Sequence, residues 1–172
     1  MRLFIALPTD GETRDALQGY QRSLAALGLD GSFSRPENLH ITLAFLGELP
    51  APGPVIEAMK AVTAAGPISL LLDRPGRFQH RDGAVLWLGP ERDRPVQRLA
   101  AALHAELRAR GFRLEDKPFQ AHITLCRRVK HGESVPRLPE ACIPYRADSM
   151  VLFRSHNPEG VLTYTPLYVQ PL

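Results

Sequence analysis

The feature that most limits the fold of this 172-residue chain is a short sequence that occurs twice. Residues 40–43 and residues 122–125 both read His-Ile-Thr-Leu, and the second copy begins 82 residues after the first. The match extends upstream, with a proline four positions and a basic residue five positions before each histidine. Two copies half a chain apart indicate two equivalent lobes, because a solenoid needs three or more repeats.

Each copy of the repeat is typical of a β-strand with one polar face. Side chains alternate along a strand, so His40 and Thr42 share one face while the isoleucine and the leucine point into the core. The same alternation places His122 and Thr124 together in the second copy. If the two lobes pack about an approximate two-fold axis, all four polar side chains face one cleft.

Two imidazoles and two hydroxyls suit chemistry at a phosphate group. Opening a cyclic phosphodiester needs a base to activate water and an acid to protonate the departing sugar oxygen, and histidine can serve as either. Threonine hydroxyls can donate hydrogen bonds to the nonbridging oxygens, where negative charge builds up. A single His-x-Thr strand would indicate only a polar face, but two matched copies predict a shared catalytic site that needs no metal and no cofactor.

Apolar periodicity divides the chain into alternating strands and helices without a low-complexity segment or a long linker. Thr9 and Glu12 have the spacing of a capping box, which predicts a helix that ends near Gly28. We therefore expect an α+β fold with mostly antiparallel sheet, formed by residues 1–172 as one domain. The expected strands cover residues 2–7, 39–46, 67–73, 84–88, 121–127, 147–154 and 162–169, and two further helices cover residues 54–65 and 93–110.

The composition narrows the function classes. A net charge of +3 gives no broad basic field for a long nucleic-acid track, so a small anionic ligand or the end of an RNA strand fits better. Sequences typical of a serine-hydrolase elbow, a phosphate-binding glycine-rich loop and a dinucleotide-binding turn do not occur. Their absence argues against a serine hydrolase, an ATP-driven ligase and a dehydrogenase.

Several features favour the cytoplasm. The apolar stretch of residues 2–7 is too short for a signal peptide, and no apolar run approaches membrane-spanning length. Cys126 and Cys142 suggest neither a disulfide framework nor a zinc site, so reduced thiols are the simpler interpretation. The remaining histidines lack the close spacing of metal ligands, and we interpret them as surface or structural residues. They are His80, His104, His131 and His156.

The whole chain resembles the 2H phosphoesterase superfamily, and more narrowly the bacterial and archaeal RNA 2′,3′-cyclic phosphodiesterases, also called 2′-5′ RNA ligases. The resemblance is carried by residues 2–6, 36–48, 119–127 and 151–155, and by Tyr164 and Leu167. The chain departs from the family at Ala121, where the family usually has proline, and at residues 33–35, where it often has tryptophan. Both departures affect the cleft wall and leave the catalytic groups in place.

This resemblance implies a bilobal fold, in which two mostly antiparallel β-sheets in a pseudo-two-fold arrangement form a V-shaped cleft with the helices on the outside. It implies hydrolysis of RNA 2′,3′-cyclic ends to 2′-phosphomonoesters, with reversible 2′-5′ joining of tRNA halves as a side activity. His40 matches the proton donor and His122 the proton acceptor. Joining would need no nucleotide cofactor, because it is the reverse of ring opening. We expect a monomer that binds RNA ends and no membrane.

Further side chains are candidates for binding the RNA. Arg127 matches the family's arginine after the second motif, but five positions beyond His122 it would leave the catalytic face unless the strand bends. Other cations could contact the RNA backbone, and aromatic rings could stack on a base, although aromatic residues near a sheet more often belong to the core. The candidates are Arg127, Arg154, Phe45, Phe119 and Tyr164, with Arg128 and Lys130 as additional cations.

Two other functions stay open at this point. The same histidine pair could cleave 2′-5′ linked oligonucleotides, or the chain could be a non-catalytic module that binds RNA ends. The two intact His-x-Thr pairs favour catalysis, because binding alone does not need two titrating groups.

Overall fold

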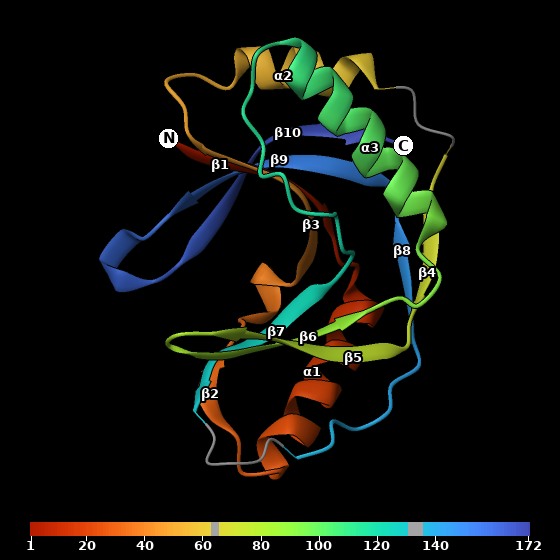
Figure 1. The fold of residues 1–172 in the computed structure, drawn as a ribbon, viewed down its shortest axis with the longest axis vertical. Helices are drawn as coiled ribbons and strands as arrows, with labels where there is room; N and C mark the ends of the chain where they lie inside the picture. Colours follow the sequence, from red (N-terminus) through yellow and green to blue (C-terminus); the bar gives the residue numbers. More distant parts are fainter. Residues whose placement is uncertain (63–65, 131–135) are drawn as a thin grey trace.

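Figure 1 shows the computed structural model of the chain, which describes residues 1–62, 66–130 and 136–172. The fold is α+β, as the sequence predicts, with helices outside a mostly antiparallel sheet. The helices are α1 (Gly11–Ala26), α2 (Gly53–Ala61) and α3 (Arg94–Ala109), with short 3-10 turns η1 (Pro36–Asn38) and η2 (Pro158–Gly160). The strands are β1 (Arg2–Pro8), β2 (Asp30–Phe33), β3 (His40–Glu48), β4 (Ile68–Leu72), β5 (Arg74–His80), β6 (Gly83–Gly89), β7 (Ile123–Lys130), β8 (Ile143–Ala147), β9 (Ser149–His156) and β10 (Thr163–Pro171).

The large sheet consists of two arms joined at one point. The first arm holds β10, β9, β1 and β3 in that order, and the second arm holds β7, β6 and β5, with β2 also paired to β7. Between the arms, β3 and β7 share one antiparallel residue pair, Ile41 with Ile123. Both isoleucines are completely buried. The two His-Ile-Thr-Leu repeats therefore meet at the junction of the arms (Figure 1), and the two sheets that the resemblance implies are two arms of one continuous sheet.

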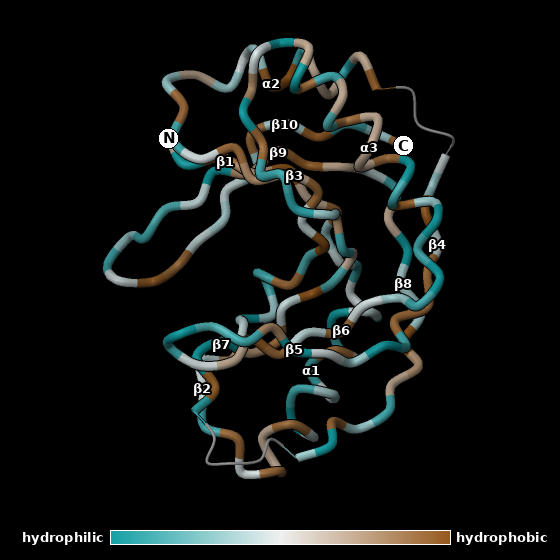
Figure 2. Tube along the Cα trace, in the orientation of Figure 1, coloured by the Kyte–Doolittle hydropathy of each residue, from teal (hydrophilic) through white to brown (hydrophobic). Residues whose placement is uncertain are grey.

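Helices cover the outer side of each arm. Two of them, α1 and α3, follow a strand of one arm in the sequence but pack against the other arm. Helix α1 follows β1 of the first arm but packs against β7 of the second arm and against β8. Helix α3 follows β6 of the second arm but packs against β3 and α2 above the first arm (Figure 1). Figure 2 shows hydrophobic segments along the strands between these helices. The crossed connections tie the two arms to each other through buried apolar side chains.

The sequence pattern does not predict β2, β5 or β8. Glycine or proline occurs in each of them, including Pro75 and Gly76 in β5, and both residue types weaken a strand. However, β5 lies at the edge of the large sheet and β8 belongs to a two-stranded sheet with β4, where a missing backbone N–H costs little. The helix expected over residues 54–65 ends at Ala61, and residues 63–65 lie outside the described residues.

The predicted capping box at Thr9 and Glu12 is wrong. Asp10 caps α1, because its carboxylate accepts a hydrogen bond of 2.7 Å from the backbone N–H of Thr13. The hydroxyl of Thr9 instead donates to the backbone carbonyl of Leu39, 3.1 Å away and directly before the first repeat. Thr9 therefore holds the start of β3 and not the start of the helix.

Gly76 lies against the indole ring of Trp87 on the neighbouring strand, and an added Cβ would overlap three ring atoms. Overpacking of this kind typically costs about 1–3 kcal/mol. We predict that Gly76→Ala lowers the free energy of unfolding in urea by that amount. Gly19→Ala is the matched control, because α1 has room for a Cβ there and alanine is favoured by about 0.5–1 kcal/mol. A Gly76→Ala protein as stable as the wild type would contradict this packing.

Candidate active site

A pocket of about 660 Å³ is lined by residues of both arms. Continuing the register of the isoleucine pair by one residue places Thr124 opposite His40 and His122 opposite Thr42. Residues opposite each other in an antiparallel pair share one face of the sheet. All four side chains line the pocket, so the structure brings the two His-x-Thr pairs together as the sequence predicts.

The same backbone contact orients both imidazoles. Nδ1 of His40 lies 2.8 Å from the carbonyl oxygen of Asn38, and Nδ1 of His122 lies 2.8 Å from that of Gln120. A carbonyl oxygen can only accept, so Nδ1 carries the proton in each neutral ring and Nε2 keeps a lone pair. The hydroxyl of Thr42 donates to Nε2 of His40 over 2.9 Å. Each repeat thus sets the same tautomer and leaves Nε2 for proton transfer.

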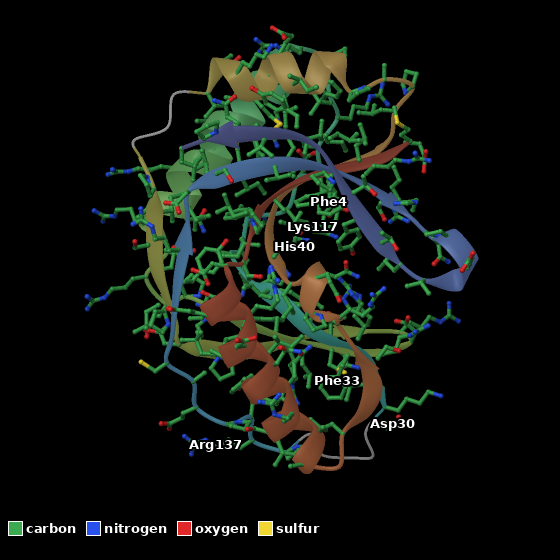
Figure 3. The ribbon with its side chains drawn as sticks, turned by 180° about the vertical axis from the view of Figure 1, so that it is seen from behind. Phe4, Asp30, Phe33, His40, Lys117 and Arg137 are labelled. Atoms are coloured by element: carbon green, nitrogen blue, oxygen red, sulfur yellow. The ribbon has the colours of Figure 1, made fainter. Side chains whose placement is uncertain are left out.

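Aromatic rings of the first arm surround His40. The ring of Phe4 lies 5.0 Å from the imidazole, and Figure 3 shows the two side chains beside each other. Tyr164 meets the imidazole edge-on at 5.4 Å, and Phe153 lies 6.5 Å away. These rings exclude water from one side of His40.

The second arm gives His122 a matching environment. Phe78 meets the imidazole edge-on at 5.0 Å, and the indole of Trp87 lies 5.9 Å from it. Trp87 is held from the other directions by the close approach of Gly76 and by the guanidinium of Arg74, 5.5 Å from the ring centre. Each catalytic candidate therefore has its own aromatic wall, contributed by its own arm.

Burial lowers the pKa of both histidines. For His40 the pKa falls to about 4, mainly because burial disfavours the charged ring, while the charges of Arg127 and His122 lower it further and the hydrogen bond to Asn38 raises it. For His122, burial is again the largest cause, with Arg127 lowering the pKa and the contact with Gln120 raising it. Both rings are therefore biased towards the neutral form at pH 7 in the free site.

A bulge in β7 brings Arg127 to the pocket. Between Thr124 and Cys126, β7 advances by two residues where β6 advances by one, which is a β-bulge at Leu125. Leu125 and Cys126 are both completely buried, so the alternation of faces shifts at this point. Arg127 consequently lines the pocket five positions after His122, where a regular strand would turn it away.

The structure separates the predicted binding residues into two groups. Phe45, which is 60% exposed, and Tyr164 line the pocket together with Arg127. Phe119 does not line it, because its ring packs against the core with its edge towards His104. Arg154 does not line it either. It pairs with core residue Leu3 and so points from the face of β9 opposite to Phe153, which faces His40.

Sequence reasoning missed several residues of the site. Phe4 and Trp87 resemble ordinary core residues in the sequence, and Phe78 lies on β5, which the pattern did not predict. His80 was interpreted as a surface residue and lines the rim of the pocket. Alternation along β1 and β6 could have identified Phe4 and Trp87, since alternate residues on these strands lie on the same face of the sheet as the His-x-Thr pairs.

His104 and His156 lie outside the pocket. His104 contacts the carbonyl oxygen of Leu43 at 2.7 Å, beneath β3, and His156 contacts the hydroxyl of Thr165 at 2.8 Å. His131 lies outside the described residues. Over the described ranges, no group of three or more His, Cys, Asp or Glu side chains is arranged to hold a metal ion. In the same part of the chain, no helix is long and apolar enough to cross a membrane.

Most of the chain is similar in sequence to proteins that carry a name. A Geobacillus stearothermophilus protein named RNA 2′,3′-cyclic phosphodiesterase is 31% identical over 98% of this chain, which spans only 56% of that relative's length. An Escherichia coli protein of the same name is 32% identical, with 96% of this chain and 93% of the relative aligned. The crystal structure of E. coli LigT complexed with 3′-AMP matches with a TM-score of 0.83 at 27% identity, over 99% of this chain and 96% of that one.

A family description covers most of the fold and both repeats. The 2′-5′ RNA ligase superfamily matches residues 11–157, which include β3 and β7 with their His-x-Thr motifs and the junction between the arms. The chain belongs to the 2′-5′ RNA ligase superfamily.

Proposed function

We propose that this chain opens the 2′,3′-cyclic phosphodiester ends of RNA to 2′-phosphomonoesters without a metal ion. The observation that carries the proposal is the meeting of two His-x-Thr motifs in one pocket, which supplies two imidazoles whose Nε2 atoms are not used by the backbone. Relatives named RNA 2′,3′-cyclic phosphodiesterase support this substrate class. A LigT structure that contains 3′-AMP supports a nucleotide ligand.

In the proposed mechanism, a water molecule attacks the cyclic phosphorus in line with the bond to O3′. Nε2 of His122 takes a proton from the water, and Nε2–H of His40 gives a proton to O3′ as the P–O3′ bond breaks. Once Nε2 of His40 is protonated it no longer accepts from the hydroxyl of Thr42, which is then free to donate, with that of Thr124, to the nonbridging oxygens. The guanidinium of Arg127 balances the charge of these oxygens. One water is consumed, and the product is a 2′-phosphomonoester with a free 3′-hydroxyl.

The lowered pKa values mean that the acid is charged only when substrate is bound. His40 has a pKa of about 4 in the free site, so at pH 7 it lacks the proton that a general acid needs. An anionic phosphodiester between the two rings favours a protonated imidazole and raises its pKa. The assignment of His40 as acid and His122 as base follows the family pattern. A substrate whose leaving group needs no proton tests this assignment.

The proposal extends to RNA joining, to the oligomeric state and to the cellular location of the protein. A 5′-hydroxyl in place of water would join two RNA ends, such as tRNA halves, through a 2′-5′ linkage, because ring opening is reversible and needs no nucleotide. Residues 1–172 would act as one bilobal unit and as a monomer, since residues of both arms of one chain line the pocket. A cytoplasmic location fits the two free thiols, Cys126 and Cys142.

The proposal is tested by incubating the protein with adenosine 2′,3′-cyclic phosphate in excess chelator. We expect continued formation of the 2′-phosphomonoester, because two imidazoles supply both the acid and the base. A linear 2′-5′ dinucleotide serves as the second substrate and separates the phosphodiesterase alternative. Loss of all turnover in chelator, restored by one divalent metal, would contradict the mechanism. Tight binding without any turnover would instead indicate a non-catalytic module.

Histidine variants test the division of roles. We predict that His40→Ala and His122→Ala each lower kcat by about 10²–10⁴-fold, and that the double variant is little worse than either, because both groups act in one event. A 2′-nitrophenyl phosphodiester, whose leaving group needs no proton, should partly rescue His40→Ala and leave His122→Ala inactive. Equal rescue of both variants would show that the acid and base are assigned wrongly. Thr42→Ala serves as the milder reference, since it removes one donor only.

A further inference from the structure

The two walls of the pocket differ in charge. The first arm contributes polar and apolar lining residues without a formal charge, apart from the imidazole that it supplies. The charged lining residues all come from the second arm and from the loop that follows β2. In Figure 2 the β5–β6 turn is hydrophilic, while the β9–β10 hairpin combines hydrophilic segments with one hydrophobic stretch. The charged set, called here the cationic wall, is Arg35, Arg127, Arg128 and Asp82.

Two consecutive arginines line the pocket, which a regular strand does not allow because neighbouring side chains point to opposite faces. The backbone of Arg128 resolves this conflict with a φ of 54°, a left-handed conformation that is uncommon for a residue other than glycine. Its guanidinium donates a hydrogen bond of 2.8 Å to the hydroxyl of Ser32 on β2. The fold therefore accepts local backbone strain to present Arg128 beside Arg127.

Arg35 adds a third arginine to the cationic wall. It lies between β2 and η1, and its Nε is 3.4 Å from the carboxylate of Glu37. Both side chains of this ion pair are about half exposed or more, at 51% and 62%. An exposed pair of this kind is worth little in water, so a phosphate group can compete with Glu37 for the guanidinium.

We propose that the RNA strand 5′ of the cyclic end runs along the cationic wall, with its first phosphodiester bound by Arg128 and Arg35. The inference rests on the proposed function, which places the cyclic phosphate between His40 and His122. The next phosphate of the strand carries a full negative charge. The cationic wall carries three arginines and one acid, Asp82, and the excess of positive charge remains when Glu37, the partner of Arg35, is counted with it. The opposite wall offers uncharged surface, including exposed Phe45 and Leu162, for the terminal nucleoside.

The test compares a 2′,3′-cyclic mononucleotide with a trinucleotide that ends in the same cyclic phosphate. The measured quantity is the ratio of kcat/KM for the trinucleotide to that for the mononucleotide, so effects shared by both substrates cancel. We expect Arg35→Gln combined with Arg128→Gln to lower this ratio about tenfold, mostly through KM. The salt dependence of trinucleotide kcat/KM should become shallower, by a log–log slope of about 0.7 for each lost phosphate contact.

Two further variants test the sign of the charge effect and its location. Asp82→Asn removes the one acid of the wall and should raise the ratio about twofold. Arg77→Gln removes an exposed arginine of β5 that lines no part of this pocket, and it should leave the ratio unchanged. An unchanged ratio in the double variant, or equal losses on both substrates, would overturn the inference.

Direct binding separates this inference from the proposed function. A fluorescent trinucleotide that ends in a 2′-phosphate is titrated with wild type and with the double arginine variant, and its anisotropy is followed. Wild-type binding without turnover of any cyclic substrate would contradict the proposed function, while about tenfold weaker binding by the double variant would still support the strand path. Equal binding by both proteins, or equal competition by a polyglutamate peptide and by RNA, would overturn the strand path.

Discussion

Over the described residues, the pairing of Ile41 with Ile123 is the one strand pair that joins the two arms of the sheet, and the geometry of the pocket follows from it. Because the pair is antiparallel, each histidine comes to lie opposite the threonine of the other repeat. Both isoleucine side chains are completely buried, which stabilises the junction by about 1.5–3 kcal/mol for each side chain. Away from this pair the strands separate, and the space that opens between them is the pocket. The repeat in the sequence thus builds one pocket from two halves.

The aromatic walls make the protonation state of this site depend on its ligand. The lowered pKa of His40, about 4 in place of 6.5, corresponds to about 3 kcal/mol against its charged form. A single negative charge about 4 Å away contributes about 4 kcal/mol at the effective dielectric of a partly buried site, which is enough to restore one proton. A second proton would meet the charges of the first imidazolium and of Arg127, so one anionic diester favours one charged ring and one neutral ring. That is the state in which an acid and a base act together.

Sequence reasoning correctly brought the two His-x-Thr pairs to one pocket, because a strand repeat with period two determines which residues share a face. It also predicted the α+β class and the three helices, whose buried apolar residues recur at regular spacing. It failed where the backbone departs from regularity. The bulge at Leu125 returns Arg127 to the pocket, and the left-handed Arg128 adds a second arginine, and neither follows from alternation. Pro75 and Gly76 interrupt the sequence pattern of β5, so neither this strand nor its residue Phe78, which contacts His122, was predicted. Phe119 and Arg154 do not line the pocket, and the sequence does not reveal this because aromatic or basic character does not show which way a side chain points.

In the proposed mechanism, two neutral imidazoles from two repeats share one phosphate, and the charge of this phosphate protonates one of them. The most direct measurement is the nitrogen chemical shift of both imidazoles by NMR at pH 7, with and without 3′-deoxyadenosine 2′-(methyl phosphate), a monoanionic diester. In the free protein both rings should be neutral with the proton on Nδ1. With the diester bound, both rings should shift, and one should gain a proton on Nε2. A response confined to one histidine, or two rings that both stay neutral in the complex, would contradict the account.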